Sequence, residues 1–224
     1  MNVIIRTAEI ADLIQIVKFI KEHFVLNEPS LLSYQIYKNN NEEHIENENE
    51  DRIDDDDDFI ASCIINGTSF VAHIDNQLIG IFIAGKIGPN EYENSLAIAN
   101  ASNDRKFADI MKFIAYVEEK ADVCNHFHVP QSLHLHIISV HENYFGNRIA
   151  SKLFKHCLDV TRADGRFPVF SVDCTSSYSA RIAEKHNMEL LSTVTYDEFN
   201  EFIGRKMFIT REPHTLVKSY GIKF

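Results

Sequence analysis

The apolar positions near the start of the chain recur every three to four residues, the period of an amphipathic helix. A short β-rich stretch covers residues 2–7. The residues with the helical spacing come after it: Ile10, Leu13, Ile14, Val17, Ile20 and Phe24. We expect this helix to end within residues 23–27, because Pro29 disfavours the helical conformation at Glu28. A second short helix is predicted over about residues 31–37.

Further along, strand patterns alternate with helix patterns. The runs SFVAHI and LIGIFIAG predict a hairpin that turns at Asp75, Asn76 and Gln77. Helices are expected at residues 107–123, at about 148–163 and in SSYSARIAEKHNM; strands are expected at residues 133–140, in PVFSVDC, around 190–194 and within 215–224. This order predicts an α/β or α+β domain built on a mixed sheet.

The charge of the chain is concentrated in one segment. The formal net charge is −11, and residues 39–58 hold eleven carboxylates and one arginine, which leaves the rest of the chain near neutrality. We expect one domain over residues 1–224, with a flexible acidic insert at about 39–58. No basic stripe offsets the insert, so nucleic acid is not an expected partner. A solvated loop is one interpretation of the insert, and a trap for cationic amines is the other.

Apolar residues make up 45% of the chain, yet no apolar run is long enough to span a bilayer. We therefore expect no membrane partner. The first residues lack the pattern of a secretory leader. The four cysteines are scattered without a CxxC pair, as in reduced intracellular proteins. A cytoplasmic protein is the expectation.

Residues 133–163 are predicted to fold as a strand, a tight loop with one glycine, and a helix. Such a loop directs backbone N–H groups and a positive helix end at one point, which suits a pyrophosphate. Arg148, Lys152 and Lys155 follow closely. An ordinary strand-to-helix turn is the alternative, because a single glycine is a weak signal.

Several segments resemble the GNAT acetyltransferases, and among them the insect arylalkylamine N-acetyltransferases. In order along the chain they are HFVLNEPSLL, INGTSFVAHIDNQLIGIFIAG, LHLHIISVHENYFGNRIASKLF, VFSVDCTSSYSARIAEKHNMEL and EPHTLVKSY. The resemblance implies a central mixed sheet of about seven strands flanked by helices, in which the fourth and fifth strands splay apart around acetyl-CoA. The acidic insert lies outside it.

The resemblance also implies which residues contact acetyl-CoA. Backbone groups of Ile138, Ser139 and Val140 would hold the acetyl and pantetheine part. The pyrophosphate would lie over Phe145, Gly146, Asn147, Arg148, Ile149, Ala150 and Ser151. Two positions depart from the family pattern: Phe145 stands where the family has Arg or Gln, and Arg148 replaces a glycine. A left-handed backbone at Arg148 would cost about 1–2 kcal/mol.

Acetyl transfer needs a neutral amine, whereas a free alkylamine has a pKa of about 10 and arrives protonated. A base must therefore take that proton. In the insect family a Glu-Pro pair after the first helix supplies the base, and Glu28 with Pro29 occupies that place here. The alternative is that Glu28 is a surface carboxylate before a helix.

The resemblance further implies that hydroxyl groups assist the departing thiolate. Thr175, Tyr178 and Ser179 are the candidates, with Ser179 preferred. Helix capping competes as an explanation for the hydroxyls at the start of this segment.

Two His-x-His pairs, at residues 126–128 and 134–136, lack further ligands at zinc spacing, so no metal is expected. Cys174 could act as a nucleophile only with a histidine beside it.

The expected activity is acetyl transfer from acetyl-CoA to a primary amine, an arylalkylamine or a polyamine, by direct attack in a ternary complex. The amine is a small-molecule partner and acetyl-CoA the co-substrate. The alternative is a weakly active or inactive acyl-CoA-binding protein of the same fold, which the departures at Phe145 and Arg148 favour.

Overall fold

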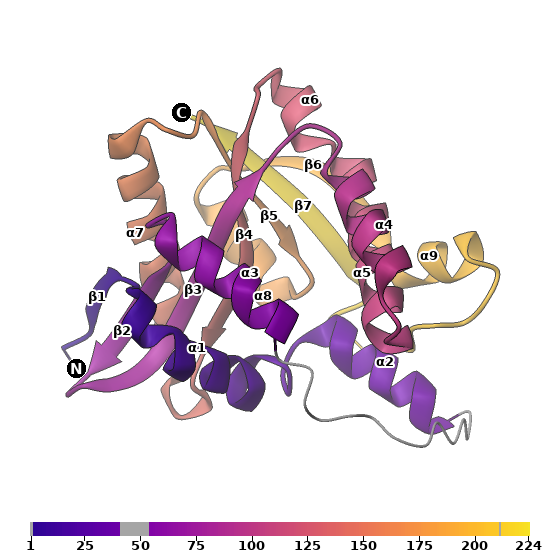
Figure 1. Cartoon of the computed structure of the whole chain (residues 1–224), viewed down its shortest axis with the longest axis horizontal. Helices are drawn as coiled ribbons and strands as arrows, with labels where there is room; N and C mark the ends of the chain where they lie inside the picture. Colours follow the sequence, from indigo (N-terminus) through magenta and orange to yellow (C-terminus); the bar gives the residue numbers. More distant parts are fainter. Residues whose placement is uncertain (1, 41–53, 211) are drawn as a thin grey trace. The chain divides into compact units, whose positions relative to one another are not determined.

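The computed structural model describes residues 2–40, 54–210 and 212–224 (Figure 1). Its strands are β1 (Ile4–Thr7), β2 (Phe70–Ile74), β3 (Gln77–Ile87), β4 (Ser132–Val140), β5 (Val169–Cys174), β6 (Glu189–Thr195) and β7 (Leu216–Lys223). Its helices are α1 (Leu13–Phe19), α2 (Pro29–Asn40), α3 (Asp54–Ile65), α4 (Glu91–Ala101), α5 (Arg105–Ala121), α6 (Val123–Phe127), α7 (Ile149–Asp164), α8 (Ser177–Lys185) and α9 (Tyr196–Phe202). Three short helical turns complete the order: η1 (Ile10–Asp12), η3 (Glu142–Tyr144) and the π-helical η2 (Ile20–Phe24).

The strands form one seven-stranded sheet in the order β1-β2-β3-β4-β5-β7-β6. Antiparallel pairs join β1 to β2, β2 to β3, and β7 to both β5 and β6. β4 and β5 run parallel: the Ser132 hydroxyl donates to the Val169 carbonyl, and two residues on His134 lies 3.0 Å from Ser171. The predicted α/β fold on a mixed sheet of about seven strands is confirmed. The divergence of β4 and β5 stays a prediction.

The chain divides into two compact units. The first comprises Met1–Asn27, Lys38–Gly85 and Leu135–Arg166, and the second Glu28–Tyr37, Lys86–His134 and Phe167–Phe224. Each unit has its own apolar cluster. The expectation of one domain over residues 1–224 stays a prediction.

In the first unit, the two faces of β3 pack against different helices because side chains alternate along a strand. Ile81 and Ile83 join the buried cluster that α1 and α3 also form. On the other face, a Cβ at Gly80 would lie 3.2 Å from side-chain atoms of both Ile149 and Leu153, so α7 approaches the backbone of β3 closely. The start of α7, which holds the predicted phosphate loop, is thereby fixed against the sheet.

In the second unit, an aromatic cluster fills the core. Phe113 of α5 stacks on Tyr196 at 5.1 Å and lies within 5.0 Å of Phe199, measured between ring centroids. Phe208 contacts both Phe113 and Tyr196. These rings lock α9 and the segment after it onto α5.

Several helices differ from the sequence-based expectation. The predicted N-terminal helix is present as η1, α1 and η2 in succession. The pattern did not predict α4, whose buried residues are only Ser95 and Ala99, so it has no apolar stripe to detect. The pattern also missed α3, α6 and α9. α6 holds His126, with His128 as its left-handed cap, so this pair does not lie on a strand.

The predicted acidic insert is described only at its two ends. Residues 41–53 lie outside the described residues, α2 extends to Asn40, and α3 begins at Asp54. Residues 54–58 thus lie at the start of a helix rather than in a loop. Within the described ranges, no helix is both long and apolar enough to cross a bilayer.

Candidate active site

Glu28 is buried at the start of α2. Only 7% of the residue is exposed, so the alternative of a surface carboxylate is wrong. Its Oε2 accepts hydrogen bonds from the Ser30 hydroxyl at 2.5 Å and from the Leu31 backbone N–H at 2.7 Å. One carboxylate oxygen therefore caps the helix, which fixes the position of the whole group.

The second carboxylate oxygen of Glu28, Oε1, does not cap the helix. Oε1 is buried and has no hydrogen-bond partner within the described ranges, and the same is true of the Tyr196 hydroxyl. Burial, followed by the charge of Glu28, raises the pKa of Tyr196 well above its usual value, which places the two groups near each other. A buried carboxylate oxygen without a partner is costly, and it is available to accept a proton or a hydrogen bond.

Tyr196 is a further candidate for the site, and sequence reasoning did not single it out. It is fully buried at the first position of α9, in a stretch for which no helix was predicted. Nothing in its local sequence separates it from an ordinary core tyrosine.

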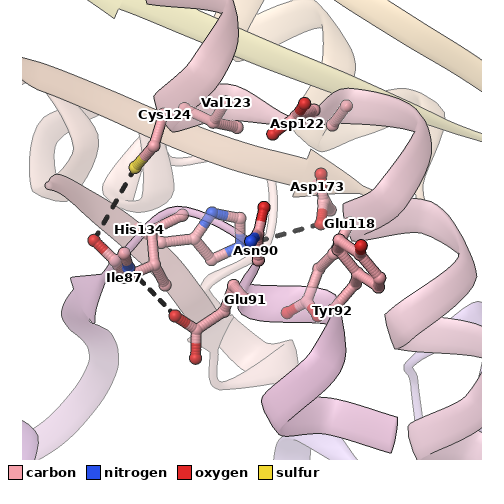
Figure 2. A pocket seen from close by; sticks show the side chains of 12 residues that line it. Ile87, Asn90, Glu91, Tyr92, Glu118, Asp122, Val123, Cys124, His134 and Asp173 are labelled. Atoms are coloured by element: carbon pink, nitrogen blue, oxygen red, sulfur yellow. Dashed lines mark hydrogen bonds and ion pairs between the residues drawn. The ribbon is translucent and has the colours of Figure 1, made fainter. Parts of the chain in front are cut away.

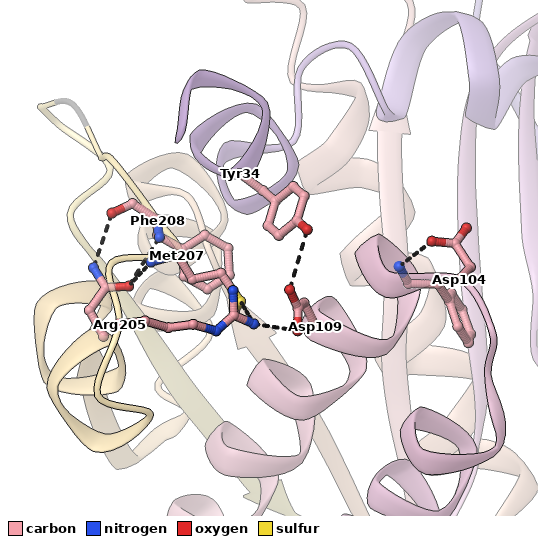
Figure 3. A network of polar contacts seen from close by, with 8 residues as sticks. Tyr34, Asp104, Asp109, Arg205, Met207 and Phe208 are labelled. Atoms are coloured by element: carbon pink, nitrogen blue, oxygen red, sulfur yellow. Dashed lines mark hydrogen bonds and ion pairs between the residues drawn. The ribbon is translucent and has the colours of Figure 1, made fainter. Parts of the chain in front are cut away.

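A polar network holds α2 to α5 (Figure 3). The hydroxyl of Tyr34 on α2 donates to Asp109 Oδ2 at 3.3 Å, and Arg205 donates to Asp109 Oδ1 at 2.5 Å. Asp109 is only 3% exposed. Burial and the Asp109 charge raise the pKa of Tyr34 to about 12, so this hydroxyl keeps its proton and stays a donor at neutral pH.

The segment after α9 is tied into the same region. The Asn200 side chain accepts from the backbone N–H groups of Met207 and Phe208 and donates to the Phe208 carbonyl. The backbone N–H of Ile209 donates to the carbonyl of Ser33 on α2. The helix that carries Glu28 is thus held by both side-chain and backbone bonds.

The hydroxyl residues after β5 have different roles. The Ser176 side chain caps α8 by accepting a hydrogen bond from the Ser179 backbone N–H. Helix capping is the role expected for hydroxyls at the start of this segment. The preferred Ser179 hydroxyl donates to the Ser176 carbonyl at 2.9 Å, so its hydrogen is already engaged. Thr175 lies between β5 and α8, partly buried. Tyr178 is exposed on α8, and its ring lies 5.5 Å from that of His214.

Cys174, at the end of β5, is poorly suited to act as a nucleophile. Burial raises the pKa of its thiol to about 12, and the nearby Ser179 hydroxyl only partly opposes this. The group is therefore a neutral thiol at neutral pH, whereas the thiolate is the reactive form.

The predicted phosphate loop lies in the first unit, at the start of α7. Phe145, Gly146, Asn147 and Arg148 are exposed, and a Cβ at Gly146 would meet no atom within 4 Å. Arg148 is the N-cap residue of α7, and its side chain makes no capping hydrogen bond. The first N–H groups of the helix, at Ile149, Ala150 and Ser151, have no partner within the helix. Open space, uncapped donors and basic side chains fit a pyrophosphate.

Arg148 has the left-handed backbone conformation expected at a position where the family pattern has a glycine. Its φ is 59° and its ψ is 23°, in the left-handed region that favours glycine. The loop therefore keeps the backbone shape that a glycine would give it, at a cost in strain.

The predicted pantetheine segment is the end of β4. Ile138 and Val140 are partly buried, whereas Ser139 is 8% exposed. The Ser139 carbonyl lies 3.4 Å from the position of a Cβ on Gly80. Ile138–Val140 and residues 145–151 belong to the first unit, whereas Glu28, Thr175, Tyr178 and Ser179 belong to the second.

An acidic pocket in the second unit is a further candidate region (Figure 2). Glu91, Glu118, Asp122 and Asp173 line it together with His134. Burial raises the pKa of Glu118 to about 8 and that of Asp173 to about 6, and it lowers the pKa of His134 to about 4. His134 Nε2 lies 3.8 Å from Asp173 Oδ2, and at neutral pH the imidazole is uncharged. His134 is thus a buried, uncharged histidine on a strand, and packing in the protein interior is enough to explain its place.

Replacing Asp109 with Asn tests the network that fixes α2. We expect Asp109→Asn to lower the free energy of unfolding by about 1–3 kcal/mol, because Arg205 loses a charged acceptor in a buried place. Urea denaturation measures the change. Asp104→Asn is the matched control on α5: Asp104 caps the helix, and Asn caps equally well, so its stability should hardly change. Equal losses in both variants would contradict the role of the network.

The raised pKa of Glu118 predicts a pH-dependent stability. In the folded state this group keeps its proton up to about pH 8, whereas the unfolded group ionises near 4.5, so the parent protein loses stability as pH rises between these values. Glu118→Gln keeps an acceptor for Ser95 and removes the titration. The melting temperature of the variant minus that of the parent should therefore increase from pH 5 to pH 8.5. The neighbouring exposed Glu119→Gln should show no such trend; a flat difference for Glu118→Gln would refute the assignment.

The left-handed Arg148 predicts a difference between two variants that both remove its charge. Arg148→Gly relieves the strain and Arg148→Ala keeps it, so the glycine variant should be more stable by about 1 kcal/mol in urea denaturation. Equal stabilities would show that Arg148 carries no strain.

Comparison with known proteins adds to this geometry. No protein-family model matches the chain. The structure of a mosquito arylalkylamine N-acetyltransferase like 5b matches with a TM-score of 0.85 and 27% identity over 100% of both chains. Drosophila melanogaster polyamine N-acetyltransferase, which forms N-acetylagmatine, matches with a TM-score of 0.82 and 25% identity over 100% of both chains. Arylalkylamine N-acetyltransferase 2 of Aedes aegypti shares the fold, with a TM-score of 0.84 at 18% identity over 100% of this chain and 99% of that one.

These likenesses extend along the whole chain and confirm the resemblance expected from the sequence. The protein has the GNAT fold and resembles the insect arylalkylamine and polyamine N-acetyltransferases.

Proposed function

We propose that this protein transfers an acetyl group from acetyl-CoA to a primary amine, an arylalkylamine or a polyamine. Two solved structures that match it over their full length are an arylalkylamine and a polyamine N-acetyltransferase, at 27% and 25% identity. The proposal treats residues 1–224 as one acetyltransferase domain, with the amine attacking directly in a ternary complex.

The buried carboxylate of Glu28 is the observation that carries the mechanism. Helix capping fixes the group through Oε2, while Oε1 is buried and without a partner in the described part of the chain. A protonated amine would supply the missing hydrogen bond. Glu28 is therefore the general base: Oε1 takes a proton from the ammonium group, directly or through one water, and leaves the nitrogen lone pair free to attack.

The start of α7 is proposed to bind the pyrophosphate of acetyl-CoA. The uncapped N–H groups of residues 149–151 and the charge of Arg148 would hold it, and Ile138, Ser139 and Val140 would hold the pantetheine part. When bound, acetyl-CoA supplies the activated acetyl group and a thiolate that leaves. Phe145, with 57% of its surface exposed, provides no charge at the position where the family has Arg or Gln.

The departing thiolate needs a proton or a hydrogen bond, for which Thr175, Tyr178 and Ser179 stay the candidates. Ser179 would first have to release the Ser176 carbonyl. Tyr178 is exposed, and among the described residues its hydroxyl makes no hydrogen bond that would have to be released. This difference shifts our preference among the three from Ser179 towards Tyr178.

Glu28→Gln tests the proposed base. Release of CoA thiol should be measured with a panel of arylalkylamines and polyamines. We expect kcat/KM to fall by about 10²–10⁴-fold, because an amide cannot accept the proton, while calorimetry shows acetyl-CoA affinity unchanged. Glu22→Gln, at an exposed glutamate paired with Lys18, is the control and should retain full activity. Retained activity in Glu28→Gln would remove Glu28 from the mechanism.

The second candidate function is an acyl-CoA-binding protein without useful turnover. The strained Arg148 and the uncharged Phe145 in the phosphate loop favour it. The same assay separates the two functions. Acetyl-CoA binding without thiol release for any amine supports the binding protein, whereas release that depends on Glu28 supports the enzyme.

A further inference from the structure

Two imidazoles and a carboxylate meet within the first unit. His23 comes from the π-helical turn η2, His141 lies between β4 and η3, and Glu142 is the first residue of η3. One ligand atom from each of the three side chains lies within 4.8 Å of the other two. More than a hundred residues separate His23 from the other two, so the fold alone creates this group.

The distances are close to those of a metal site. His23 Nδ1 lies 2.8 Å from Glu142 Oε2, and His141 Nδ1 lies 3.7 Å from the same oxygen. Zinc binds nitrogen and oxygen at about 2.0–2.2 Å in tetrahedral geometry, which sets neighbouring ligand atoms about 3.3–3.6 Å apart. The two observed distances bracket that value, so a cation would need only small side-chain movements.

The side chains are held in place before any ion binds. The His23 ring packs on Phe19 with centroids 4.5 Å apart and on His141 at 4.3 Å. The backbone N–H of His141 donates to the Ile79 carbonyl, which fixes the end of β4. His141 Nδ1 accepts the N–H of Asn143 at 3.2 Å; a cation bound at this nitrogen would replace that hydrogen bond, while the ring contacts still hold the imidazole in place. Such pre-orientation lowers the cost of assembling a site.

The exposed fractions of the three side chains also suit a bound ion. The side chains of His23 and His141 are 12% and 16% exposed, whereas that of Glu142 is 54% exposed. Two shielded imidazoles and one carboxylate open to solvent leave room for water as a fourth ligand. Two histidines and one glutamate with a water is a ligand set that zinc adopts in proteins.

We propose that His23, His141 and Glu142 form a binding site for one divalent transition-metal ion, with Zn²⁺ as the best match. The competing explanation is a simple hydrogen-bonded pair. The chain offers such a pair for comparison: His126 Nε2 lies 2.9 Å from Glu189 Oε1, and its ring packs on Phe127, but no second imidazole is grouped with it among the described residues.

Calorimetric titration with Zn²⁺ tests the proposal on the untagged chain of residues 1–224, stripped of metal. We expect one Zn²⁺ per chain. Co²⁺ at the same site should give visible absorption bands of the strength typical of four or five ligands. His23→Phe keeps the aromatic packing and Glu142→Gln keeps an acceptor for His23. Each should weaken Zn²⁺ binding by more than about 100-fold, since even the loss of a residue that only hydrogen-bonds a metal ligand costs about 10–100-fold.

His126→Phe is the matched control and should bind Zn²⁺ as the parent does. The proposal is overturned if the parent binds no stoichiometric Zn²⁺, if His23→Phe and Glu142→Gln bind it unchanged, or if His126→Phe loses binding equally. Circular dichroism and thermal melting verify that each variant is folded. The readouts do not involve acetyl transfer, so the outcome is independent of the proposed enzymatic function.

Discussion

The burial of the Glu28 carboxylate at the start of α2 is the constraint on which the proposed chemistry depends. An ionised group loses much of its hydration when buried, and proteins keep such groups only where other contacts compensate. Here the Ser30 hydroxyl and the Leu31 N–H satisfy one oxygen, and the other remains without a partner among the residues described. The protein thus holds a proton acceptor in a fixed position that solvent hardly reaches.

That position is maintained by interactions from distant parts of the sequence. Tyr34 and Arg205 both bind Asp109, and the aromatic cluster around Phe113 and Tyr196 packs α9 beside them. The buried charge of Asp109 is therefore paired, as buried charges must be. The phosphate loop shows a different form of compromise. Arg148 adopts a left-handed backbone, which costs stability locally and keeps the loop in the shape that a glycine would allow.

Local features of this architecture could be predicted from the sequence, and long-range ones could not. The strand, loop and helix of β4 and α7 follow from hydrophobic period and turn residues, whereas Glu28 was singled out only by the resemblance of its Glu-Pro pair to the insect family. The network of Tyr34, Asp109 and Arg205 could not be predicted, because no local signal links residues so far apart. The helix α4 was missed for a different reason: it presents no apolar stripe. The cluster of His23, His141 and Glu142 likewise exists only after folding.

The central claim is that Glu28 Oε1 accepts the proton of the substrate amine. A crystal structure with a bisubstrate analogue, in which an amine is joined to CoA through an acetyl bridge, tests it most directly. The account predicts the amine nitrogen within about 3.2 Å of Glu28 Oε1, or linked to it by one ordered water. A well-ordered analogue that leaves Oε1 without a partner would contradict the account.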